Sequence, residues 1–236
     1  DVRGGGHFSG RITAPIVFAG AIAKQILAKQ GIHVGAHILS IKDIYDEYFD
    51  MRLSNETLNY LSEQQYPVLN KDIYDQFVKT IDEARMSQDS VGGKIECAII
   101  GLKAGLGDPF FDSIESHLSS LLFSIPAVKS VAFGNDKISE MFGSEANDCY
   151  YYDKDVIKTK TNNNGGIIGG ISNGMPIVFN VGIKPTPSIS KIQETIDIKH
   201  HQNTTLEIHG RHDPCIVFRA TVVVEAMAAL TILDLV

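Results

Sequence analysis

The chain has 236 residues, of which 44% are hydrophobic and 21% are charged, enough apolar sequence for a globular core. Its formal net charge of −7 argues against nucleic acid or an anionic membrane surface as the partner, because both require a cationic footprint. The three cysteines are widely spaced and form no CxxC pair. They exclude a disulfide framework and a zinc knuckle, and they favour reduced thiols in a cytoplasm.

The first half of the chain predicts alternating helices and strands. A helix is expected at 13–29, ended by Gly31, with Gly20 at a close packing contact. A strand at 32–41, a polar loop through 58–67 and a helix at 71–85 follow. The apolar residues that predict the buried faces of the two helices are Ala14, Val17, Phe18, Ala21, Ile22 and Ile26 in the first, and Ile73, Phe77, Ile81 and Ala84 in the second.

The second half repeats this order, with a strand at 94–102, a helix at 112–125 and strands at 128–133 and 176–183. Residues 134–160 are typical of a loop. The apolar run 215–236 carries Arg219, Glu225 and Asp234, which favours a buried helix over a membrane span. Asp213-Pro214 predicts its start, with Asp213 at the N-cap. We therefore expect an α+β fold, a layered arrangement of antiparallel sheets and helices, in a single domain over 1–236.

A glycine-rich stretch at 161–174 precedes the strand at 176–183 and the turn Lys184-Pro185-Thr186-Pro187-Ser188. Gly-rich backbone followed by a cation and hydroxyls is typical of a site for a phosphate or a flavin. The glycines are equally consistent with plain turns. Neither a GxGxxG motif after a strand nor a GxxxxGK[ST] motif is present, so the Rossmann and P-loop interpretations gain no support.

Two kinds of site are consistent with the remaining polar residues. The first is a metal site built from His200, His201, His209, His212 and Asp213, whose spacings match no ordinary ligand motif and are as typical of a polar surface. The second is an anion pocket, in which Asp213 could move a proton beside clustered cations. Its candidate cations, each of which could instead be a surface ion-pair partner, are Arg3, Arg11, Lys184 and Arg211.

Six blocks of sequence, in order along nearly the whole chain, resemble one family. They are RGGGHFSGRITAPIVFAGAIAKQIL at 3–27, DSVGGKI at 89–95, GLGDPFFD at 105–112, NGGIIGGISNG at 164–174, KPTPSI at 184–189, and GRHDPC with VVEAM at the end. The combination is similar to chorismate synthase.

The resemblance implies an FMN-dependent lyase of the shikimate pathway, within aromatic amino-acid biosynthesis. In that family 5-enolpyruvylshikimate 3-phosphate loses phosphate in a 1,4-anti elimination that gives chorismate. The flavin must be reduced, by NADPH or by a separate reductase, although the reaction has no net redox change. A cytoplasmic homotetramer with a small anionic substrate, and with no nucleic acid, membrane or metal partner, is implied as well.

The resemblance also assigns site residues. It makes Asp213 the carboxylate that assists proton movement near the flavin, and Arg11 an arginine of the substrate site. The residues that it implies for cofactor binding are His7, Phe8, Ser9, Ala146, Asn147, Gly169, Lys184, Pro185, Thr186, Pro187, Ser188 and Arg211.

The family's GESHG-like and GHAD-like motifs, whose histidines act as general acids, do not occur in these residues. We therefore expect the chain to be a fragment without the family's N-terminal segment and extreme C-terminus, and to have little activity by itself. The alternatives are a folded, non-catalytic fragment that binds no flavin and a metal-dependent hydrolase.

Overall fold

The computed structural model describes residues 6–210 and 213–236, and its centre is a five-stranded antiparallel sheet. The strand order is β2-β1-β3-β9-β4, so chain neighbours β1 and β2 pair at one edge and β9 returns between β3 and β4. The strands are β1 (His33–Ile41), β2 (Ile44–Tyr45), β3 (Gly93–Ile100), β4 (Val128–Phe133) and β9 (Ile177–Ile183).

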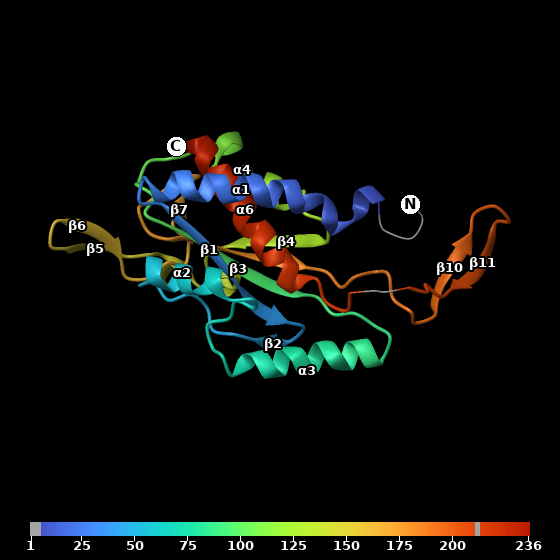
Figure 1. Cartoon of the computed structure of the whole chain (residues 1–236). Helices are drawn as coiled ribbons and strands as arrows, with labels where there is room; N and C mark the ends of the chain where they lie inside the picture. The colour runs from blue at the N-terminus through green and yellow to red at the C-terminus, as the bar shows by residue number, and fades with distance from the viewer. Residues whose placement is uncertain (1–5, 211–212) are drawn as a thin grey trace.

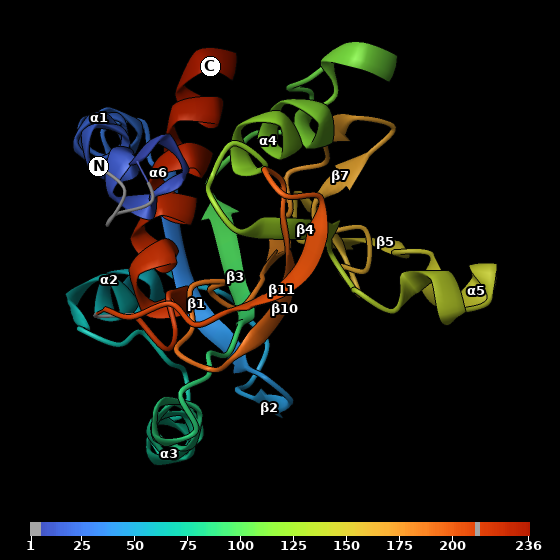
Figure 2. The same ribbon diagram turned by 90° about the vertical axis from the view of Figure 1, so that its right-hand side faces the viewer.

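Helices cover both faces of this sheet (Figure 1). One face carries α1 (Ala14–Ala28), α4 (Ile114–Leu122) and α6 (Val217–Leu235), with α6 packed on β1 and β3. The other side carries α2 (Asn55–Glu63) and α3 (Ile73–Met86), and α1 and α3 lie on opposite sides of the sheet in both views (Figure 2). This layered arrangement confirms the predicted α+β class.

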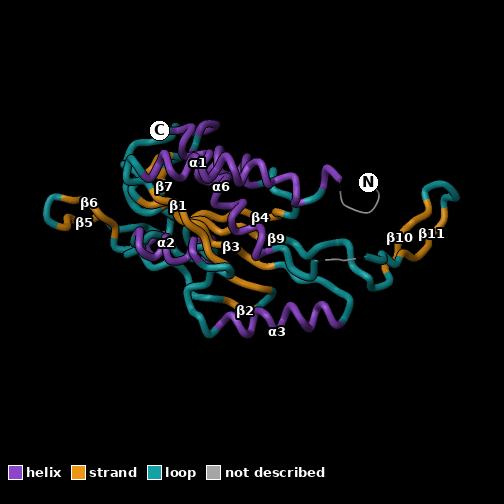
Figure 3. Tube along the Cα trace, viewed as in Figure 1, coloured by secondary structure: helices purple, strands orange, loops and turns teal. Residues whose placement is uncertain are grey.

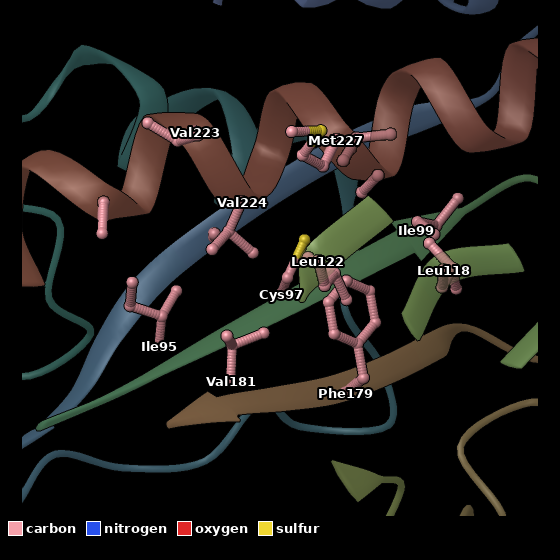
Figure 4. Close-up of a cluster of buried hydrophobic side chains, with 14 of the residues drawn as sticks. Ile95, Cys97, Ile99, Leu118, Leu122, Phe179, Val181, Val223, Val224 and Met227 are labelled. Atoms are coloured by element: carbon pink, nitrogen blue, oxygen red, sulfur yellow. The ribbon is translucent and has the colours of Figure 1, made fainter. Parts of the chain in front are cut away.

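Side-chain alternation along β3 separates an apolar face from a polar one. Ile95 and Cys97 point toward α6, where Val224 and Met227 meet them in the largest buried cluster (Figure 4). The intervening residue Glu96 points to the opposite face, which α2 and the loop after β2 cover. The apolar face therefore forms the core, and the polar face is free to hold charged groups.

The predicted stripe of α1 is wrong, although the helix itself is confirmed. Phe18, Ile22 and Ile26 are exposed, and the buried positions are Gly20, Ala23 and Leu27. A Cβ at Gly20 would lie 2.5 Å from the Cα of Ala226, so only glycine lets α1 approach α6 this closely. Small residues therefore determine which face of α1 is buried, as the predicted close contact at Gly20 had indicated.

Three two-stranded hairpins complete the fold: β5 (Tyr150–Asp153) with β6 (Val156–Thr159), β7 (Ile167–Ile168) with β8 (Ile171–Ser172), and β10 (Gln193–Asp197) with β11 (Gln202–Leu206). β5–β6 projects at one end of the molecule and β10–β11 at the other (Figure 3). The prediction of a loop over 134–160 is wrong for β5–β6. Short helical turns occur at η1 (Gly6–Phe8), η2 (Gly10–Thr13), η3 (Phe110–Asp112), η4 (Ile138–Glu140) and α5 (Gly143–Ala146).

Within the described residues, one helical stretch, Gly10–Ala28, is long and apolar enough to cross a membrane by length and composition alone. Signal sequences and core helices of soluble proteins meet the same criterion. In this fold the stretch contains α1, whose small residues pack along α6.

Candidate functional site

Residues 90–93 connect two of the predicted site segments at one end of the sheet. The Ser90 hydroxyl donates to the carbonyl oxygen of Thr186 at 2.7 Å. The next amide, Val91 N, donates to the carbonyl oxygen of Pro214 at 2.8 Å. A Cβ at Gly92 would lie 3.0 Å from Pro185 Cδ, so glycine permits this close packing. Segment 184–188 and the residues before α6 therefore lie against the same short loop.

Asp213 is not the N-cap of α6, which corrects the predicted helix start. The helix begins at Val217, and its N-cap is Ile216. Asp213 Oδ1 accepts a long hydrogen bond, 3.4 Å, from the amide of Cys215, and Oδ2 forms an ion pair with Arg219. Because neither oxygen caps the helix, the Asp213 carboxylate is held in a turn before α6, next to residues 90–93.

The predicted N-terminal site residues lie at the same end of the molecule as the start of α6, the right-hand end in Figure 1. Ser9 is the N-cap of η2, and its hydroxyl accepts from the amide of Arg11 at 3.3 Å. His7, Phe8 and Arg11 are exposed, Phe8 to 90%. The side chains of His7, Phe8 and Arg11 are therefore free to meet a ligand. Arg3, Arg211 and His212 lie outside the described residues.

Three further predicted site residues lie at the opposite end of the sheet. Gly169 belongs to the β7–β8 turn, at the left in Figure 1, and Ala146 and Asn147 form the end of α5 and its C-cap. β9 joins the glycine-rich stretch to Lys184, and its seven residues span roughly 20 Å. Within one chain, Gly169, Ala146 and Asn147 therefore lie too far from Lys184 to contact the same ligand.

Backbone amides at the start of the glycine-rich stretch bind Asp148 of the same chain. Asp148 accepts hydrogen bonds from the amides of Asn163 and Asn164 at 2.8 and 2.9 Å, and from the Thr161 hydroxyl at 2.7 Å. Burial alone would raise the pKa of Asp148, but the hydrogen bonds from Asn164 and Thr161 hold it below its usual value. The hypothesis that 161–174 and Lys184 form one phosphate site is therefore wrong within one chain.

A groove of about 610 Å³ opens at the end of the sheet, where β1 and β9 end and β3 and β4 begin. We call it the lysine groove. The charged side chains that line it are Lys42, Asp43, Lys94, Lys129 and Lys184, and Ser40, Ser90, Ser130 and Tyr45 add hydroxyl groups. Of the predicted site residues, Lys184 and Pro185 line it. From the sequence alone, Lys184 was the one lysine of this groove that was predicted to belong to a site. The others, Lys42, Lys94 and Lys129, lie in three separate segments of the chain.

A buried ionic cluster lies farther along the polar face of the sheet, the face opposite α6. His37 is fully buried, with Nε2 2.9 Å from Glu96 Oε2 and Nδ1 3.4 Å from Asp46 Oδ2. Burial alone would lower the pKa of His37, but hydrogen bonds with Asp46 and Glu96 raise it above its usual value. Glu96 also accepts from the amide of Phe49 at 2.7 Å. These contacts hold the loop after β2 against the sheet.

The described histidines of the metal hypothesis, His200, His201 and His209, do not converge on a shared site. His200 pairs with Asp197 at 2.6 Å, and His209 lies 3.5 Å from Glu207. Residues 6–210 and 213–236 contain no group of three or more His, Cys, Asp or Glu side chains that could share a metal ion. The described residues therefore give the metal-dependent hydrolase no support.

Comparison with known proteins relates the whole chain to one family. The family model described as chorismate synthase matches residues 1–236. The chain is 44% identical over 235 residues to chorismate synthases of Korarchaeum cryptofilum and Thermococcus gammatolerans, covering 99% of this chain and 64% of each relative. A relative from Dehalococcoides mccartyi is 44% identical over 239 residues, with 100% of this chain and 64% of the relative covered.

A solved structure described as a crystal structure of chorismate synthase agrees with this relation. It superposes with a TM-score of 0.78 at 27% identity, covering 96% of this chain and 63% of that one. The chain thus spans a little under two thirds of the length of the relatives it matches. The match over every residue of the sequence and the shared fold lead to one conclusion: the chain belongs to the chorismate synthase family.

Proposed function

We propose that the chain forms part of a chorismate synthase active site, at which 5-enolpyruvylshikimate 3-phosphate loses phosphate and becomes chorismate with the help of reduced FMN. The observation that carries the proposal is the contact of residues 90–93 with both Thr186 and Pro214. This contact supports the proposal because the turn 184–188 and the residues directly before α6 lie against the same loop. We further propose that residues 1–236 act as one domain, because one buried cluster runs from Ala23 to Ile232.

The turn 184–188 suits an anionic, phosphate-bearing cofactor. The hydroxyl oxygen of Thr186 is buried and, among the described residues, has no hydrogen-bond partner. Lys184 lines the lysine groove, and Ser188, two residues after Thr186, is half-buried. An orphaned hydroxyl next to a free ammonium is the donor set that a flavin phosphate or ribityl chain requires. Pro185 and Pro187 restrict the backbone of this turn, which preorganises it.

The N-terminal turns would contribute a second wall to the same site. His7 and Phe8 are exposed, and Ser9 fixes the direction of η2 through its hydrogen bond to Arg11 N. The exposed guanidinium of Arg11 presents a planar fork suited to a carboxylate or phosphate of the substrate. When bound, reduced FMN supplies electron density for loss of the phosphate group. The residues of this chain orient the anions and handle the proton.

Asp213 has one oxygen suited to receive a proton. Its Oδ2 is engaged by the Arg219 guanidinium, whereas the contact of Oδ1 within the described residues is a long one, 3.4 Å, with the amide of Cys215. The ion pair fixes the orientation of the carboxylate, and the weak contact leaves a lone pair available at Oδ1. A proton moving at the flavin or substrate would accordingly be accepted or released at Oδ1 of Asp213.

The remaining implied flavin contacts require more than one chain. Gly169, Ala146 and Asn147 lie about one strand length from Lys184, so both groups contact one flavin only when a second copy supplies the distant group. We propose that the homotetramer brings them together in a cytoplasmic enzyme, to which NADPH or a separate reductase supplies electrons.

FMN titration tests the proposal, with bound and free flavin followed by fluorescence in oxidising and reducing buffer. Saturable binding is expected, and Thr186→Val should raise the Kd about fivefold or more, because the orphaned hydroxyl is lost. Thr195→Val, on the exposed strand β10, is the matched control and should change nothing. Absence of FMN binding by both the chain and the full-length protein would favour the alternative, a folded protein without a flavin.

A further inference from the structure

Segment 141–152, which contains α5 and the start of β5, carries one buried charge in otherwise accessible chain. α5 lies at the outer edge of the molecule (Figure 2), and Phe142 and Asn147 are exposed. Among residues 141–152, each of which the structure describes, Asp148 alone is buried, with 7% of its surface exposed. Burial of a carboxylate is costly unless hydrogen bonds compensate for the lost water. The surroundings of Asp148 therefore have to supply donors.

All the hydrogen bonds to the Asp148 carboxylate come from the start of the glycine-rich stretch. Oδ1 accepts from the Thr161 hydroxyl at 2.7 Å and from the Asn163 amide at 2.8 Å. Oδ2 accepts from the amide and from the side-chain Nδ2 of Asn164, both at 2.9 Å. Because each oxygen receives two donors, both the position and the rotation of the carboxylate are fixed.

The same two asparagines hold the residues that precede Asp148. Asn163 Nδ2 donates to the carbonyl oxygen of Glu145 at 3.1 Å, and Asn164 Nδ2 lies 3.5 Å from the carbonyl oxygen of Ala146. The bonds made by Asp148 are the shorter ones in this connection. Loss of the Asp148 carboxylate would therefore leave residues 145–147 held by the two longer contacts.

The glycine-rich stretch is in turn attached to the central sheet. The amide of Asn135, just after β4, donates to the carbonyl oxygen of Asn163 at 2.9 Å. The amide of Val178, in β9, donates to the carbonyl oxygen of Gly165 at 3.2 Å. Asp148 thus connects an exposed segment, through residues 161–165, to the end of β4 and the start of β9.

We propose that Asp148 is a positioning residue for the flavin site, which holds Ala146 and Asn147 ready for a flavin bound at Lys184 of a second copy. This inference rests on the proposed function, in which those two residues contact the flavin of another copy. Both oxygens of Asp148 are engaged by donors, so Asp148 acts through its neighbours. Fixing the segment before FMN arrives removes an ordering cost that would otherwise reduce the affinity for FMN.

Asp148→Asn tests the role in the full-length protein, because its amide nitrogen would face N–H donors where an acceptor is required. Hydrogen–deuterium exchange of the peptide that covers 142–147 should become faster as this segment loosens. The Kd for FMN should rise about fivefold or more. At saturating FMN, kcat should stay within about twofold of wild type, because the carboxylate does not touch the reacting atoms.

The matched control is Asp153→Asn, the same substitution in the same region of the chain. Asp153 lies in the exposed strand β5, where it pairs with Lys158 at 2.6 Å. An exposed ion pair of this kind stabilises little, so neither exchange at 142–147 nor the Kd for FMN should change. Equal effects of the two substitutions would overturn the proposal, because they would point to the loss of charge alone.

A milder variant decides the matter if Asp148→Asn does not fold. Asn164→Ala keeps the backbone amide bond to Asp148 and removes the Nδ2 donor that reaches Asp148 and Ala146. We expect it to raise the Kd for FMN about two- to threefold and to speed exchange at 142–147. An unchanged Kd for Asn164→Ala, with exchange faster, would leave these contacts a purely structural role and overturn the proposal.

Thr186→Val, measured beside these variants, separates this inference from the proposed function. Weaker FMN binding by Thr186→Val together with an unchanged Kd for Asp148→Asn would overturn the role of Asp148 and leave the proposed function standing. No FMN binding by the full-length wild type would overturn the proposed function, and this inference with it. A kcat at saturating FMN that falls as steeply as the affinity would contradict a role confined to positioning.

Discussion

Gly20→Ala should drive α1 and α6 apart. The added Cβ would lie 2.5 Å from Ala226 Cα, whereas carbon atoms normally approach to about 3.5–4.0 Å. The axes must therefore separate by about 1 Å, and overpacking of this kind costs about 1–3 kcal/mol. Alanine's better helix propensity offsets about 1 kcal/mol of that cost. We expect a net destabilisation of up to about 2 kcal/mol.

Urea unfolding followed by far-UV circular dichroism measures this effect in a double-mutant cycle. Ala226→Gly alone should destabilise by about 1 kcal/mol through propensity; combined with Gly20→Ala it removes the overlap with the Ala226 methyl group but leaves the contact with the Cα of residue 226. The two changes should therefore show a favourable coupling of about 0.5–1 kcal/mol. Ala21→Gly, at an exposed position of α1, calibrates the propensity contribution. Strict additivity, or a Gly20→Ala protein more stable than wild type, would refute the close-packing explanation.

Two other predictions concern titratable groups. His37 has a raised pKa. Its contribution to the free energy of unfolding is therefore complete below the ordinary pKa of about 6.5 and is lost as the pH rises through the raised value. The stability difference between wild type and His37→Gln, from urea unfolding, should shrink at alkaline pH, and a difference that grows would contradict the buried ion pairs. Burial raises the pKa of Cys97, and raises that of Cys215 to about 11, whereas Cys149 is exposed. One thiol per native chain should react rapidly with a disulfide reagent, Cys149→Ser should abolish this, and reaction of all three would contradict the burial.

Much of the central sheet was predictable because its strands follow simple patterns. The strand expected at 128–133 is β4, and those expected at 32–41, 94–102 and 176–183 agree with β1, β3 and β9 within two residues at either end. Each of these strands has apolar residues on the face that is buried in the core. The hairpin β5–β6 was not predicted, because its side chains are mostly exposed and provide no alternation between buried and polar positions. The exposed hairpin β10–β11 gave no signal for the same reason.

The polar loop expected through 58–67 is wrong where α2 extends to Glu63 and buries Leu58 and Leu61. For the helices that were predicted, the buried faces were harder to predict than the positions. Periodicity placed α1 correctly but favoured its largest apolar side chains, including Phe18 and Ile22, as the buried stripe. The structure buries Gly20 and Ala23 instead, because a close helix pair needs small residues at its contact. Hydrophobic size alone does not distinguish a core face from a face that remains exposed.

The candidate site was predictable only where a local motif carried it. The turn at 184–188 and Asp213 come from short motifs, and the structure places them against one loop. The His37–Glu96 pair and the cations at Lys42 and Lys129 are brought together by strand pairing across distant segments. A single sequence holds no local record of such pairings.

The central claim is that Asp213 serves the proposed elimination, and anaerobic turnover with reduced FMN and 5-enolpyruvylshikimate 3-phosphate tests it most directly. In the full-length protein, Asp213→Asn should lower kcat about 10²-fold or more, while its Tm changes little because the ion pair with exposed Arg219 stabilises by less than about 1 kcal/mol. Asp234→Asn, at the exposed far end of α6, should retain full turnover. Unchanged turnover of Asp213→Asn would contradict the account and leave Asp213 with a structural role only.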